Sequence, residues 1–275
     1  MAGDPGSFFV PLGGDLWQAT PHTTGPWDER FQHGGPPSAL LARAVEATTP
    51  RADMFVARVT VEILGAIPVG ELLLTSRVAR PGRSVELLEA SLSGGGREVA
   101  KATAWRVRRS EGVAVPTRAV RAPALPPTTQ ELICEGWVDG YLSAMEWRFA
   151  TGGLTVPGPA AAWARMRVPL VPDEEPSPLQ RVMALADSGN GSSSELDLAR
   201  WHFINPELTV HLHRDAVGEW VCIDATTTIT EGGVGLATSV LSDTTGPIGV
   251  GAQSLLVAPR CAGFLADALV CDDDG

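Results

Sequence analysis

The chain has 275 residues, of which 44% are hydrophobic and 19% are charged, so it can bury a large core, and a disordered chain is excluded. A formal net charge of -11 and a pI near 4.9 argue against a nucleic-acid partner, because binding to phosphate backbones needs a surplus of Lys and Arg. Thirty Gly and 22 Pro favour many short strands over long helices.

The N-terminal residues 1–6 contain neither a basic stretch nor a following apolar segment. No uncharged apolar run reaches the roughly 18 residues of a membrane span. We therefore expect a soluble cytoplasmic protein without membrane insertion. The four cysteines lack CxxC or CxxH spacing, which predicts reduced thiols rather than disulfides or metal ligands. They are Cys134, Cys222, Cys261 and Cys271.

A first helix is predicted over residues 37–47, where Pro36 and Pro37 suit a first helical turn. Its apolar side chains between Leu40 and Val45 leave little polar surface, so we expect the sheet to cover it. The motif His33-Gly34-Gly35 comes directly before this helix. Its glycines expose backbone N–H groups at a helix N-terminus, and such donors can stabilise an oxyanion.

A Pro-rich segment divides the chain nearly in half. Between Ser110 and Glu135 the sequence contains Pro116, Pro123, Pro126 and Pro127 and shows no clear periodicity. We predict an N-terminal domain over residues 1–112, a linker over 113–140, and a C-terminal domain over 141–275 that ends in a short tail.

The two halves resemble each other in sequence. Strand-like residues 59–63 match 208–212 at an offset of 149 residues, from Thr60 to Thr209. The turns at Gly70 and Gly218 match at an offset of 148, and residues 102–107 match 252–257 at an offset of 150. Three matches in register indicate duplication.

A second helix is predicted from Pro178 to Asp187. Asp187 follows Leu185 and Ala186 on a largely apolar helix, where an unpaired buried carboxylate would be costly. The ordinary interpretation is a helix-end residue before Ser188, where the chain exits to solvent. A functional interpretation requires buried partners.

Two amides are candidate partners. Gln253 lies in an apolar strand, where a buried amide needs hydrogen bonds, although a backbone bond would satisfy it equally well. Its repeat counterpart is Thr103, so the amide is specific to the second half and indicates one specialised site. Asn205 precedes Pro206 and is either a turn residue or part of that site.

The usual signatures of serine hydrolases, nucleotide-binding loops, zincins and dinucleotide-binding folds are absent from the sequence. We therefore expect no cofactor. His211 and His213 alternate on a strand and face the same side, so they could bind metal if a third ligand lay nearby. Surface or core histidines are the more ordinary interpretation, and no metal is expected.

An apolar helix followed by an antiparallel meander is most simply buried when the sheet curls around the helix. The sequence thus predicts an α+β double hot-dog fold, in which two tandem repeats each wrap a curved antiparallel sheet around a central helix. Two such repeats can pair edge to edge into one continuous sheet, which removes exposed strand edges. The ligand site would then lie between them.

Three stretches resemble the acyl-CoA thioesterase II family, whose members are double hot-dogs. They are Phe31-Gln32-His33-Gly34-Gly35-Pro36-Pro37-Ser38-Ala39-Leu40-Leu41, the run from Trp201-His202-Phe203-Ile204-Asn205-Pro206 to Leu212-His213-Arg214, and Gly249-Val250-Gly251-Ala252-Gln253-Ser254. The resemblance implies an acyl-CoA substrate and a homo-oligomer, expected to be a dimer.

The resemblance also implies site residues. In the family an Asp, a hydroxyl residue and a Gln hold the water that attacks the thioester, and these positions fall on Asp187, Asn205 and Gln253. Asn205 departs from the family, since an amide presents its donor and acceptor differently. The amides of Gly34 and Gly35 resemble the hot-dog feature that receives the thioester oxygen.

Two other functions stay open. Hot-dog hydratases and dehydratases use a His with an Asp or Glu on opposing elements, and His33 is the helix-adjacent histidine, although their motif is not visible around it. An acyl-CoA-binding protein without useful turnover is the other alternative, because a fold does not fix its function.

Overall fold

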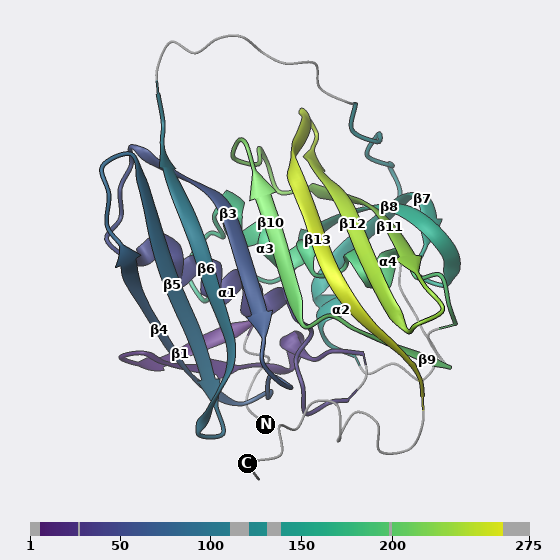
Figure 1. Cartoon of the computed structure of the whole chain (residues 1–275), viewed down its shortest axis with the longest axis horizontal. Helices are drawn as coiled ribbons and strands as arrows, with labels where there is room; N and C mark the ends of the chain where they lie inside the picture. Colours follow the sequence, from purple (N-terminus) through teal and green to yellow (C-terminus); the bar gives the residue numbers. More distant parts are fainter. Residues whose placement is uncertain (1–5, 27, 111–120, 131–138, 198–199, 261–275) are drawn as a thin grey trace.

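In the computed structural model, which describes residues 6–26, 28–110, 121–130, 139–197 and 200–260, the strands form one antiparallel sheet. Its order is β1-β2-β4-β5-β6-β3-β10-β13-β12-β11-β8-β7, with β9 paired to β13. Strands of the first half occupy one side of the sheet and strands of the second half the other (Figure 1).

The first half contributes β1 (Phe9–Gly13), β2 (Leu16–Ala19), β3 (Met54–Ile63), β4 (Glu71–Arg80), β5 (Val85–Gly94) and β6 (Arg97–Arg108). The second half contributes β7 (Met145–Gly153), β8 (Val156–Met166), β9 (Trp201–Ile204), β10 (Glu207–Leu212), β11 (Val221–Ile229), β12 (Val234–Asp243) and β13 (Gly246–Pro259). The helices are α1 (Gly35–Ala47), α2 (Tyr141–Ala144), α3 (Pro178–Ala186) and α4 (Gly189–Ser192), with a 3-10 turn at Pro21–Thr23.

Strands β3 and β10 join the two halves. They pair antiparallel, with Thr60 opposite Thr209 and the two hydroxyl oxygens 3.2 Å apart. These threonines occupy matched positions of the sequence repeat, and the pairs on either side of them are symmetric, with Val59 opposite Val210 and Val61 opposite Leu208, as a two-fold axis through the junction requires. The predicted edge-to-edge pairing is confirmed, and a local two-fold relation between the halves follows.

Helix α1 begins at Gly35, two residues before its predicted start, because Pro36 and Pro37 both fit in its first turn. Helix α3 begins after Ser177, whose hydroxyl accepts a hydrogen bond from the Gln180 amide at 3.1 Å. The two helices pack against each other behind the sheet (Figure 1). Each also contacts strands of its own half, α1 on β4 to β6 and α3 on β8 and β11.

Part of the predicted linker lies against the sheet. The Gln130 amide donates to the Trp147 carbonyl at 2.9 Å, and Leu125 packs against a buried cluster that contains Trp163 and Cys222. Residues 113–120 and 131–138 of that linker, and the tail after 260, lie outside the described residues. The domain division therefore stays a prediction.

Cys222 is a free, buried cysteine, and burial together with the charge of Asp224 raises the pKa of its thiol to about 12. The other three cysteines lie outside the described residues. Within the described ranges, no helix combines the length and apolar character needed to cross a membrane.

Candidate functional site

Asp187 ends α3 as its C-cap residue and is only 4% exposed. Its Oδ1 accepts a hydrogen bond from Asn205 Nδ2 at 2.7 Å and another from Gln253 Nε2 at 3.2 Å. The interpretation of Asp187 as a helix-end residue facing solvent is therefore wrong. The chain does turn after α3, but it turns inside the protein, where the amides of Asn205, between β9 and β10, and of Gln253, on β13, satisfy the carboxylate.

Two glycines bring the first half against this carboxylate. A Cβ atom placed on Gly34 would lie 2.6 Å from Asp187 Oδ2, and one on Gly35 would lie 2.3 Å from the Ala184 carbonyl oxygen of α3. Any larger residue would push the helices apart. The start of α1 and the end of α3 thus meet at a distance that only glycine permits.

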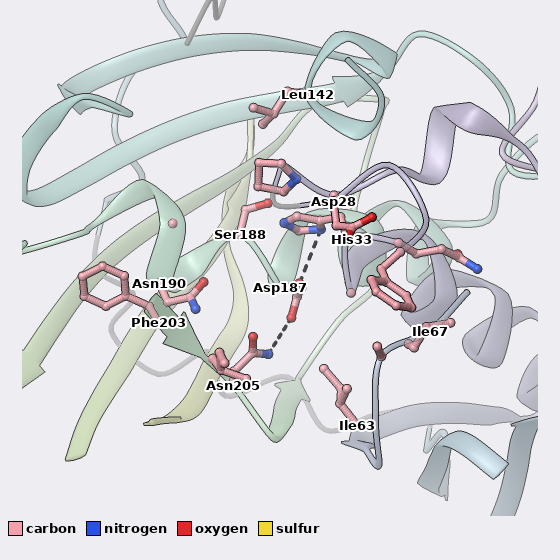
Figure 2. Close-up of a pocket in the computed structure, with 18 of the residues that line it drawn as sticks. Asp28, His33, Ile63, Ile67, Leu142, Asp187, Ser188, Asn190, Phe203 and Asn205 are labelled. Carbon is pink, nitrogen blue, oxygen red and sulfur yellow. Dashed lines mark hydrogen bonds and ion pairs between the residues drawn. The ribbon is translucent and has the colours of Figure 1, made fainter. Parts of the chain in front are cut away.

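His33 lies at the same junction, above Asp187 in Figure 2. The Gly35 amide donates to His33 Nδ1 at 3.0 Å, which places the imidazole proton on Nε2. Burial lowers the pKa of His33, although the charge of Asp187 opposes this effect. The 3.4 Å approach of Nδ1 to Asp187 Oδ2 is therefore a contact of a neutral ring, and it becomes an ion pair only if His33 is protonated.

Tyr141 is a site residue that the sequence interpretation missed. Its ring stacks on His33 with centroids 3.9 Å apart, and its hydroxyl bonds the Ala184 carbonyl at 2.9 Å and Ser188 Oγ at 2.8 Å. Burial raises its pKa, so the phenol stays protonated. A signal existed, since Tyr141 is the only tyrosine of the chain, but it falls at the predicted end of the linker.

Only one amide at the start of α1 is free to bind a ligand. Of the four residues from Gly34 to Pro37, the two prolines carry no N–H, and the Gly35 N–H is bonded to His33. Across the described parts of the chain, the Gly34 N–H has no acceptor. The expected pair of glycine donors therefore reduces to Gly34.

A cavity of about 240 Å³ lies between the two halves at this junction. Its polar wall contains His33, Gly34, Asp187, Ser188, Asn190 and Asn205. Its apolar wall contains Phe31, Ile63, Ile67, Leu142, Trp147, Leu154, Phe203 and Ile204. Figure 2 shows Asp187 between His33 and Asn205, with Ile63 and Ile67 to one side and Phe203 to the other. An apolar chain that ends in a polar carbonyl group fits this distribution.

Gln253 supports the site from behind the cavity wall. It is 2% exposed, and its Nε2 also donates to the Asp187 carbonyl oxygen at 3.1 Å. Its Oε1 accepts from the Asn190 amide at 3.1 Å, an approach that the missing side chain of Gly189 permits. Gln253 thus fixes both Asp187 and the first turn of α4.

The described residues contain no group of three His, Cys, Asp or Glu side chains placed to hold a metal ion. His211 and His213 accordingly have no third ligand of these types in that part of the chain.

Comparison with family models finds two matches. Residues 23–107 match the acyl-CoA thioesterase N-terminal domain, and residues 116–257 match the acyl-CoA thioesterase C-terminal domain. A search of curated proteins gives no significant match.

Solved structures share the hot-dog fold across nearly the whole chain. A protein from Alicyclobacillus acidocaldarius with a hot-dog fold has a TM-score of 0.72 at 16% identity, over 94% of this chain and 97% of its own. A thioesterase II from Thermobifida fusca has a TM-score of 0.71 at 17% identity, over 91% and 95%. The acyl-CoA thioesterase II TesB2 from Mycobacterium marinum has a TM-score of 0.63 at 15% identity, over 92% and 96%. At these identities the likeness establishes the fold.

Proposed function

This chain belongs to the acyl-CoA thioesterase family, and from that premise we propose that it hydrolyses acyl-CoA to a free acid and CoA with Asp187 as the general base. The observation that carries the proposal is the position of Asp187. A buried carboxylate faces a largely apolar cavity, opposite a free helix N-terminal amide from the other half of the chain.

The proposed reaction is a direct attack by water. Asp187 accepts a proton from the water as its oxygen bonds to the thioester carbonyl carbon. The Gly34 N–H, at the positive end of α1, stabilises the oxyanion. When the carbon–sulfur bond breaks, the proton held by Asp187 passes to the CoA thiolate. No covalent enzyme intermediate is needed.

The two amides have different proposed roles. Asn205 lines the cavity, so its Nδ2 orients Asp187 while its carbonyl oxygen can accept from the attacking water. Gln253 lies behind the wall and acts through Asp187, as a positioning residue. Asn205 stands where the resembling family has a hydroxyl, and the longer amide reaches the carboxylate while keeping an acceptor for water.

The direct test is CoA release from a panel of acetyl-, butyryl-, octanoyl- and palmitoyl-CoA, followed with a thiol reagent. We expect CoA release above the buffer rate for at least one ester. The acyl-chain length of the preferred ester indicates how much of the apolar wall the substrate's acyl chain contacts. Binding of every ester without release from any would contradict hydrolysis and support the binding-only alternative.

Arg30 is proposed to bind the CoA phosphates. It is the only Arg or Lys among the described residues that line the cavity, and its side chain is 74% exposed at the mouth, paired with Asp28. Water and salt screen an exposed charge contact, so its contribution to binding is small. We expect Arg30→Ala to raise KM roughly three- to fivefold at low salt and to leave kcat unchanged.

The control for this prediction is Arg77→Ala, which removes another exposed, ion-paired arginine that does not line this cavity. Its KM should equal that of the unaltered chain. Equal KM values for both variants would remove Arg30 from CoA binding.

One observation favours a second candidate, a hot-dog hydratase or dehydratase. His33 and Asp187 come from opposing halves, lie 3.4 Å apart and both line the cavity, which matches the use of a His and a carboxylate from opposing elements in that reaction. Loss of crotonyl-CoA absorbance without thiol release would identify hydration. Thiol release without hydration would identify the hydrolase.

The remaining sequence predictions extend this proposal. They are a homodimer, a cytoplasmic location, a role in fatty-acid metabolism, the domain division at residues 113–140, and a sheet wrapped around its own central helix in each half.

A further inference from the structure

A second cavity, of about 350 Å³, lies at the opposite end of the α1 and α3 pair. The first cavity is located where α1 begins and α3 ends. The second is located where α1 ends and α3 begins, and it includes Glu46 near the end of α1 and Pro178 at the start of α3. The candidate active site does not use it.

The two-fold axis through Thr60 and Thr209 relates the two cavities. Residues 149 positions apart take the same place in each wall, as they do in the strand repeat. The matched pairs are Ile63 with Leu212, Asn205 with Val56, Ile204 with Phe55, and Ile67 with Ala216. The second cavity is therefore the symmetry counterpart of the first.

A carboxylate occupies the corresponding place in both. Asp187 follows the last residue of α3 and faces the N-cap residue of α1, whereas Glu46 is the last residue but one of α1 and accepts from the N-cap residue of α3, Ser177. Glu46 accepts hydrogen bonds from Ser177 Oγ at 2.7 Å and Gln180 Nε2 at 2.9 Å. Both carboxylates thus lie near the positive end of the opposing helix.

The supporting amides are not repeated. Val56 stands in place of Asn205, and Thr103 in place of Gln253, so among the described residues no sheet amide that corresponds to either one bonds Glu46. Glu46 instead accepts hydrogen bonds from Ser177 and Gln180, which connect the last turn of α1 to the start of α3. This end of the helix pair has a cavity but lacks the groups proposed for hydrolysis.

The wall combines apolar side chains with three arginines, Arg51, Arg106 and Arg109. Arg51 donates to Asp53 and Arg106 to Glu86, so Arg109 at the rim is the candidate for an added anion. Val56, Leu212 and Met54 supply the apolar part. Arg109 has a half-exposed side chain over the Phe55 ring, 4.9 Å from its centroid. Its guanidinium donates one hydrogen bond, to Asp215, out of five available N–H groups, so in the described part of the chain it retains donors for an anion.

We propose that this second cavity binds an anionic amphiphile, an aliphatic chain ending in a carboxylate, with the chain against Val56 and Leu212 and the carboxylate on Arg109. The cavity holds this ligand without turning it over. The proposal does not depend on thioester hydrolysis at the first cavity.

The test uses octanoate labelled with ¹³C at its carboxyl carbon, added to the full chain and observed by NMR. The structure provides a matched pair of variants, because Leu212→Trp fills the second cavity and Ile63→Trp fills its symmetry counterpart. We expect a bound carboxyl resonance that disappears in Leu212→Trp and persists in Ile63→Trp. The resonance of bound octanoate should not depend on whether the protein hydrolyses acyl-CoA.

A second variant tests the head group without filling the cavity. Arg109 is exposed at the rim, so Arg109→Ala should leave the fold intact and weaken octanoate binding at this site roughly tenfold, because it removes a charge-assisted hydrogen bond. Octylammonium should not compete for the site.

Several results would overturn the proposal: no bound resonance sensitive to Leu212→Trp, unchanged affinity in Arg109→Ala, or octylammonium binding in place of octanoate. CoA release is a separate measurement. If Leu212→Trp still releases CoA but loses the bound resonance, both proposals stand. If the native chain releases no CoA but keeps the resonance, the second cavity stands alone.

Discussion

Asp187→Asn is expected to lower kcat for CoA release by roughly a hundredfold to ten-thousandfold, the range in which general bases contribute. The substitution keeps the size of the side chain and leaves an oxygen that can still accept from Asn205 and Gln253. The fold and KM should therefore change little, while the proton acceptor is lost. Steady-state release of CoA from the preferred ester measures the effect.

The control is Asp224→Asn, which makes the same chemical change on the exposed face of β11. It should release CoA at the native rate. Near-native kcat in Asp187→Asn, with circular dichroism unchanged in both variants, would remove Asp187 from the role of base.

Gly35→Ala is expected to destabilise the protein by about 2–3 kcal/mol or more, at the upper end of overpacking costs. Its Cβ would lie 2.3 Å from the Ala184 carbonyl oxygen, a backbone atom that cannot move unless α3 moves with it. The helices must separate, and the junction between Gly34 and Asp187 must open. The urea midpoint of unfolding, followed by tryptophan fluorescence, reports the change.

Gly70→Ala provides the comparison, because a Cβ there meets nothing within 4 Å and the backbone angle is ordinary. Its midpoint should match the native one or exceed it slightly, since alanine restricts the unfolded chain. A Gly35→Ala protein as stable as Gly70→Ala would show that α1 and α3 tolerate a wider spacing than the contact implies.

Much of the fold could be predicted from the repeat in the sequence. The 149-residue offset between Thr60 and Thr209 predicted matched strands, and the structure pairs these two residues at the junction. Helix α1 was predicted because apolar residues and paired prolines are local signals. The offset could not give the helix spacing, since α4 lengthens only the second half between its helix and its junction strand.

The site was predicted less completely. Asp187, Asn205 and Gln253 do meet, because a buried carboxylate requires amide partners that the same half supplies. The positions of Gly34 and Tyr141 depend on contacts between segments more than 40 residues apart, for which a local pattern carries no signal. The hydrogen bond from the Gly35 amide to His33 could not be predicted for a different reason. It depends on a side-chain rotamer, which the sequence does not specify.

The β3–β10 junction joins two halves of a single polypeptide, and that covalent continuity has an evolutionary consequence. A pair of identical subunits around the same axis would have to carry the same residue at both ends of its helix pair, so any change at one end would be copied at the other. Gene fusion removes that constraint. It lets one end hold Asp187 with Asn205 while the other diverges to Glu46 with Val56, so that one ancestral pocket can specialise while its duplicate is free to acquire a different ligand.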